Sequence, residues 1–174
     1  VIPAFLPDPV NLDWQMRLIE TLKTMPVDFA CRPHPEGILK GRLHPLASVI
    51  DIQTKRFEDH IADTNVFVFD YVQSTTFYEA LCTDRIVVLI DMGADIFDED
   101  MSAALRQRCR TVRAHYDDRN RPHVDVDELH EAICSGPENG DPGFFRQLLL
   151  DEGNPTHGES KATSPVQSNA AAQY

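Results

Sequence analysis

The chain has 174 residues, 42% of them hydrophobic and 25% charged, which is the composition of an ordinary globular protein long enough for one sizeable core. A formal net charge of −12 argues against nucleic acid or an anionic membrane surface as the main partner. Any phosphate site must therefore be local, made of backbone N–H groups and a few arginine or histidine side chains.

Cysteine usage and hydropathy indicate a cytoplasmic protein. The four cysteines are far apart and form no CxxC pair, which favours free buried thiols in a reducing compartment over disulfides or a zinc site. No apolar run approaches the roughly 20 residues of a transmembrane helix, and no signal peptide is recognisable. We expect a chain without a transmembrane segment, either free in the cytoplasm or peripheral at the inner face of the membrane. Because Val1 opens an apolar segment, we also expect it to be part of a longer protein.

Strands and helices are expected to alternate along the first part of the chain. Asp13 is a candidate cap for a helix whose apolar residues recur at helical spacing up to Met25, where Pro26 stops it. The prolines and the glycine of 32–37 predict an irregular loop at the end of a strand. The expected elements are a strand at 1–6, a helix at 14–25, a strand at 27–31, the loop at 32–37, a short strand at 49–52 and a short helix at 55–62.

The central stretch 66–81, VFVFDYVQSTTFYEAL, carries the strongest signal. Alternating Val and Phe predict a strand buried on both faces, and a helix is expected to follow the polar residues Ser74, Thr75 and Thr76. A Ser or Thr at a helix start accepts a hydrogen bond from a free backbone N–H, and Glu79 is expected to complete a capping box. With the apolar run 86–90, the stretch forms a βαβ unit of a parallel sheet.

The second half continues the alternation. The expected elements are a helix at 98–108, a strand at 111–115, a polar loop at 117–122, a helix at 125–133 and a helix at 142–150. The sequence therefore predicts an α/β fold, a Rossmann-like parallel sheet with helices on both faces, over residues 1–150. Neither GxGxxG nor a P-loop is present. Residues 151–174 contain almost no aliphatic side chains and are expected to be a disordered tail.

Two polar segments are expected to meet at the carboxyl edge of the sheet, where ligands of such folds bind. One is Arg32-Pro33-His34-Pro35, and the other is Ser74-Thr75-Thr76. Each also has a simpler interpretation. The hydroxyls could only cap a helix, His34 could only hold a loop through a backbone carbonyl, and Arg32 could pair with a nearby acid.

RPHPEG and DYVQSTTFYEAL together resemble the carboxyl-terminal half of GT-B glycosyltransferases of bacterial surface-polysaccharide synthesis. The similar enzymes are capsule Kdo transferases, sialyl- and polysialyltransferases, and the CDP-glycerol glycerophosphotransferases of teichoic-acid synthesis. The resemblance implies one half of a GT-B fold that binds a nucleotide-activated sugar donor, of the CMP or CDP type. It also implies a glycan or lipid-linked acceptor, no resident cofactor, and an amino-terminal Rossmann-like half that this chain lacks. The fragment is expected to be inactive alone.

Roles for individual residues follow from the same resemblance. His34 would act on the donor phosphate as the catalytic group, with Arg32 beside it and Pro35 shaping the turn. Ser74, Thr75 and Thr76 would bind the donor phosphate.

Glu79 would lie one helical turn further on, against the ribose or base, or would serve only as a cap. The sequence departs from the family where Gln73 replaces a second Ser. It departs again where Thr83-Asp84-Arg85 replaces a Gly-Lys-Pro-like turn.

Several alternatives stay open at this point. A nucleotide-sugar epimerase of GT-B fold would use a UDP donor, and a non-catalytic nucleotide- or carbohydrate-binding module would need no reaction. Asp91-Met92-Gly93 lies at a strand end without a distinguishing partner. Four acids, Asp95, Asp98, Glu99 and Asp100, could suggest a metal, but acids in the first turn of a helix are expected from its dipole, and no metal site is predicted.

Overall fold

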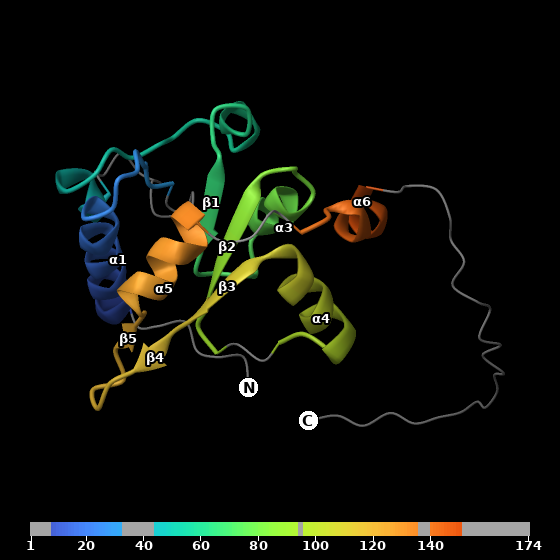
Figure 1. Ribbon diagram of the computed structural model, residues 1–174. Helices are drawn as coiled ribbons and strands as arrows, with labels where there is room; N and C mark the ends of the chain where they lie inside the picture. Colours follow the sequence, from blue (N-terminus) through green and yellow to red (C-terminus); the bar gives the residue numbers. More distant parts are fainter. Residues whose placement is uncertain (1–7, 33–43, 94–95, 136–139, 151–174) are drawn as a thin grey trace, which may run out of the picture.

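The computed structural model describes residues 8–32, 44–93, 96–135 and 140–150 (Figure 1). Three earlier expectations lie outside these ranges: the strand at 1–6, most of the loop at 32–37, and the tail at 151–174. The elements are α1 (Asp8–Lys23), η1 (Pro45–Ser48), η2 (Glu58–His60), β1 (Val66–Phe69), α3 (Thr75–Leu81), β2 (Ile86–Asp91), α4 (Glu99–Arg108), β3 (Arg110–Arg113), β4 (His115–Tyr116), β5 (Pro122–His123), α5 (Val126–His130), η3 (Glu131–Ser135) and α6 (Gly143–Leu150).

A parallel three-stranded sheet in the order β1-β2-β3 forms the centre of the fold. Phe67 is paired with Val87, and Leu89 is paired with Thr111. The prediction of an α/β fold with a parallel sheet is thereby confirmed. The central strand is β2, whose middle residues are fully buried, whereas every residue of β1 is only half-buried. The expectation that β1 is buried on both faces is confirmed in part, because Val66 and Val68 pack against one core cluster and Phe67 and Phe69 against the other, while each stays partly exposed at the edge of the sheet.

Helices cover both faces of the sheet, because β2 carries apolar side chains on both of its faces (Figure 1). Val88 and Ile90 pack in one cluster with Trp14 of α1 and Leu129 of α5. Val87 and Leu89 face the other way and pack against α3, α4 and α6. Because successive residues of a strand point to opposite faces, one apolar run supplies both halves of the core.

The first helix begins earlier than the sequence predicts. It starts at Asp8 instead of after Asp13, and the Asp13 carboxylate instead pairs with Arg17 one turn further on, at 2.9 Å. Asp is common both as the N-cap and within the first turns of a helix, so the sequence pattern alone did not show which position Asp13 occupies.

The predicted strands at 27–31 and 49–52 are reduced to one parallel bridge between Cys31 and Ile52. The predicted helix at 55–62 is a short 3₁₀ turn, η2. The polar loop predicted at 117–122 is the turn of a hairpin between β4 and β5, with Asn120 at a φ of +58°. Backbone N–H groups of Arg121 and Arg119 and the Arg121 side chain donate to Asp117, and these bonds lower the pKa of Asp117. A carboxylate that accepts several local donors therefore organises this turn.

Two arginines from different helices hold the carboxyl end of α3. Arg108 of α4 is 2% exposed, and its guanidinium donates to the carbonyls of Leu81 at 2.9 Å and Thr83 at 2.7 Å. Arg146 of α6 donates to the carbonyl of Cys82 at 2.7 Å and pairs with Asp84 at 2.9 Å. The last carbonyls of a helix have no partner within the helix, so these contacts satisfy groups that would otherwise be left unpaired.

Replacing Arg108 by Met is expected to lower the free energy of unfolding by about 3 kcal/mol, because several buried carbonyls lose their donors at once. Arg106→Met is the matched control, because Arg106 lies in the same last turn of α4 but is exposed. Urea denaturation of the two variants measures the difference. Equal losses would contradict the role assigned to Arg108.

Candidate functional site

Ser74 caps the amino end of α3. Its hydroxyl oxygen accepts a hydrogen bond from the backbone N–H of Phe77 at 3.1 Å, so Ser74 is the N-cap and Thr75 is the first helical residue. Thr75 is exposed, and Thr76 is half-buried. The sequence thus places three hydroxyls at the carboxyl edge of the sheet, and one of them is already engaged in capping.

The expected capping box is wrong. With Ser74 as N-cap, the third helical residue is Phe77, whereas a capping box needs an acid or amide at that position. Glu79 lies two residues further along. Its charge acts on Arg56 and on the thiol of Cys82.

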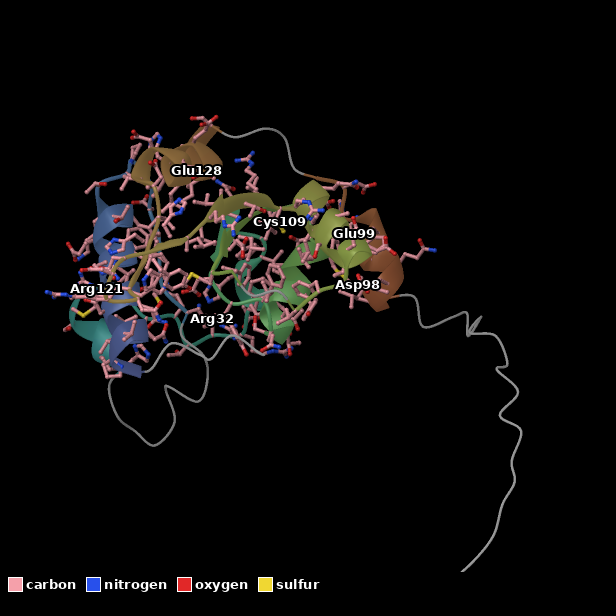
Figure 2. The ribbon with its side chains drawn as sticks, turned by 90° about the horizontal axis from the view of Figure 1, so that it is seen from below. Arg32, Asp98, Glu99, Cys109, Arg121 and Glu128 are labelled. Atoms are coloured by element: carbon pink, nitrogen blue, oxygen red, sulfur yellow. The ribbon has the colours of Figure 1, made fainter. Side chains whose placement is uncertain are left out.

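Arg32 and Thr76 are brought together across 44 residues of sequence. Arg32 Nη1 donates to Thr76 Oγ1 at 3.3 Å, and Arg32 Nε donates to the carbonyl of Lys55 at 3.2 Å. Figure 2 shows Arg32 beside α3. Arg32, the first residue of one predicted polar segment, therefore contacts Thr76, the last residue of the other, at this edge. His34 and Pro35 lie outside the described residues.

Asp70 is a residue that the sequence interpretation passed over. It follows β1 directly, and its carboxylate accepts a hydrogen bond from the buried indole of Trp14 at 2.8 Å. Burial raises the pKa of Asp70, and the bond from Trp14 partly offsets that rise. Burial, reinforced by the charge of Asp70, also raises the pKa of the Cys31 thiol. The signal that the sequence offered for this site was an acidic residue directly after a predicted strand.

An open depression of about 610 Å³ lies on another side of the α3 amino end. It is lined by Gln73, Ser74, Thr75, Tyr78, Ile96, Phe97 and Leu149. Two predicted phosphate-binding residues, Ser74 and Thr75, thus border a hollow. The sequence interpretation missed the apolar residues of its wall, because they come from three separate segments.

Other candidate residues have structural roles. The carboxylate of Asp91 accepts a bond from the N–H of Gly93 at 2.8 Å, and Asp98 caps α4 through the N–H of Met101. Among the described residues, no group of three or more His, Cys, Asp or Glu side chains could hold a metal ion. Within the same ranges, no helix has the length and apolar character that crossing a membrane requires.

No protein-family model, curated protein or solved structure matches the chain significantly.

Variants at the start of α3 test which hydroxyl caps the helix. Ser74→Ala is expected to lower the free energy of unfolding by about 1 kcal/mol, because the N–H of Phe77 loses its side-chain acceptor and keeps only the backbone carbonyl of Ser74. Ser74→Asp keeps an acceptor and is expected to stay near wild type, and Thr75→Ala removes a hydroxyl that caps nothing. Urea denaturation measures all three. An equal loss in Thr75→Ala and Ser74→Ala would contradict the assignment of Ser74 as the cap.

The raised pKa of Asp70 predicts a specific pH dependence. The folded state binds this proton more tightly than the unfolded state, where the carboxyl pKa is about 3.9. The stabilisation that protonated Asp70 contributes is therefore fully present below a pH of about 3.9, and it is lost as the pH rises through the raised pKa of the folded state. Asn cannot ionise but still offers Trp14 an acceptor, so Asp70→Asn should gain stability relative to wild type over the pH interval from about 4 upward.

The measurement is urea denaturation of both proteins across that pH interval. Asp118→Asn, in the exposed hairpin turn, controls for the loss of one negative charge. A stability difference between Asp70→Asn and wild type that stays constant with pH, or that shrinks as the pH rises, would contradict the assignment.

Proposed function

We propose that the chain is the donor-binding half of a GT-B-type glycosyltransferase or glycerophosphotransferase of surface-polysaccharide synthesis. Its ligand is a nucleotide-activated donor, of the CMP or CDP type. The observation that carries the proposal is the hydrogen bond between Arg32 and Thr76, which joins the ends of the two polar segments. A cation and hydroxyl groups at one sheet edge can share a phosphate, and the chain supplies them locally in spite of its net charge of −12.

The path of the chain supports a Rossmann-like arrangement. Cys31 forms a parallel bridge with Ile52, and its thiol also lies within electrostatic reach of Asp70 at the end of β1. The three-stranded sheet is filled in one direction, from β1 through β2 to β3. Ligands of open α/β sheets bind outside the carboxyl ends of the strands. Arg32 and Thr76 lie at those ends.

The chemistry that this edge supports is stabilisation of a leaving phosphate. In the proposed reaction, an acceptor hydroxyl oxygen bonds to the transferred group and gives its proton to a base on the acceptor side. The bond between that group and the phosphate oxygen breaks, and its electron pair goes to the phosphate oxygen. Donors that are already aimed at the developing charge lower the barrier. Arg32 and the Thr76 hydroxyl that it contacts supply such donors, and His34 is proposed as a further one. A second Rossmann-like half would supply the acceptor side, so this chain alone is expected to bind without turnover.

Isothermal titration calorimetry with CMP and UMP tests the proposal. CMP is expected to bind, and Arg32→Ala is expected to weaken it by about tenfold to a hundredfold, the value of a hydrogen bond to a charged group. Arg119→Ala is the matched control, because Arg119 is an exposed arginine in the β4–β5 turn. Preference for UMP would favour the epimerase alternative. Absence of binding by both nucleotides would overturn the proposal.

A further inference from the structure

Exposed apolar side chains are concentrated on α6. Among the described residues, seven large hydrophobic side chains are exposed, and four of them belong to this helix of only eight residues. The four are Phe144, Leu148, Leu149 and Leu150, with exposed fractions between 43% and 62%. Figure 1 shows α6 at the periphery of the molecule, beside α3. Single exposed apolar residues are ordinary, but a cluster of them is typical of a surface that another molecule covers.

Two of these residues form a continuous stripe. Phe144 and Leu148 are four residues apart, so they are neighbours on the same side of the helix. Phe145, on the adjacent side, is 1% exposed and anchors α6 in the core. The ring of Phe144 meets that of Phe145 edge to face, with centroids 5.1 Å apart. Leu150 shares its side of the helix with Arg146 instead. We call Phe144 and Leu148 the outer face of α6.

The helix is held in place before any partner binds. Where it begins, the Asp141 carboxylate accepts a hydrogen bond from the N–H of Gly143 at 2.8 Å. One turn further, Arg146 donates to the carbonyl of Cys82 and pairs with Asp84, both beyond the end of α3. Because these contacts and Phe145 fix α6, its outer face needs little ordering when it is covered.

The outer face begins away from the carboxyl edge of the sheet. Arg146 contacts Cys82 at the end of α3, whereas Leu149 lies with Ser74 at the start of α3. The two helices are therefore antiparallel, and Phe144 lies toward the opposite edge. A partner on this face is thus independent of the nucleotide site proposed above.

The charges around α6 indicate which partner fits. Exposed acids lie near both ends of the helix, Asp84 and Asp141 near its start and Asp98 near its end. The one basic residue of α6, Arg146, is already paired. In a symmetric contact between two copies of this chain, each with a net charge of −12, these acids would face one another. An anionic lipid surface would be repelled for the same reason.

We propose that the outer face of α6 binds an amphipathic helix of a partner protein, with leucine-like side chains on one side and lysine or arginine beside them. Apolar side chains at helical spacing would pack on Phe144 and Leu148, as they do when a helix docks on a hydrophobic surface. The flanking basic side chains would meet Asp141 and Asp98 at the two ends. Such an arrangement combines burial of the exposed stripe with complementary charge.

Fluorescence anisotropy with a labelled synthetic peptide, built of leucine and lysine at helical spacing, tests the proposal. This lysine peptide is expected to bind. Leu148→Ser and Phe144→Ser are each expected to weaken it by about tenfold, because each removes apolar area from the contact. Leu150→Ser is the matched control, because Leu150 is also an exposed leucine of α6 but lies on a different side. It is expected to leave the affinity unchanged.

Thermal denaturation verifies that the three variants are folded. Absence of binding by the lysine peptide would overturn the proposal. Unchanged affinity in both outer-face variants, or an equal loss in Leu148→Ser and Leu150→Ser, would do the same, because the peptide would then bind elsewhere through its charge.

Three further measurements separate the other occupants. A peptide with glutamate in place of lysine is expected to bind about ten times more weakly, and equal binding would contradict the role of the acids. Sedimentation velocity is expected to show a monomer, and phosphatidylcholine vesicles are expected not to bind. A dimer that Leu148→Ser dissociates would overturn the proposal in favour of a second copy, and vesicle binding that Leu148→Ser abolishes would overturn it in favour of a membrane.

Discussion

The arrangement of the candidate site depends on how α3 ends rather than on how it begins. Arg108 and Arg146 reach the last carbonyls of α3 from two different helices, and Arg108 does so from a fully buried position. A seven-residue helix is too short to be stable by itself, so its direction must come from its surroundings. Fixing the carboxyl end fixes the axis, and the axis determines where Ser74, Thr75 and Thr76 present their hydroxyls.

The same constraint explains the placement of charge. Burying a guanidinium costs free energy, and burial lowers the pKa of Arg108 accordingly. The cost is offset by hydrogen bonds to carbonyls rather than by a buried carboxylate. Asp70 shows the opposite choice at the other edge, where a half-buried carboxylate is met by a neutral indole. Arg108 of α4 thus stabilises the end of α3, and Asp70 after β1 bonds Trp14 of α1.

Local signals in the sequence predicted much of this fold. The run 86–90 identified the central strand, because five consecutive apolar residues between polar turns suit a strand buried on both faces. Asp98 marked the start of α4, since a cap bonds the residues directly after it. Ser74, Thr75 and Thr76 were also recognised as the start of a helix, although the capping partner assigned to them was wrong.

Contacts over long sequence distances could not be predicted in this way. The pair between Trp14 and Asp70 spans 56 residues, and nothing in either neighbourhood specifies the other. The bond from Arg32 to Thr76 spans 44 residues, and only the general rule about strand ends suggested that they meet. The hairpin of β4 and β5 was missed because Asp117 and Asn120 look like residues of any polar loop. The strands themselves are only two residues each.

The position of α6 has a consequence for the mobility of the site. Leu149 contributes one wall of the depression, while Leu148 and Leu150 of the same helix are 53% and 62% exposed. Because one helix borders both the hollow and solvent, a shift of α6 would move one wall of the hollow. A molecule that bound the outer side of α6 and shifted Leu149 would change the width of the hollow, and a ligand in the hollow would then alter the affinity for that molecule by the same factor.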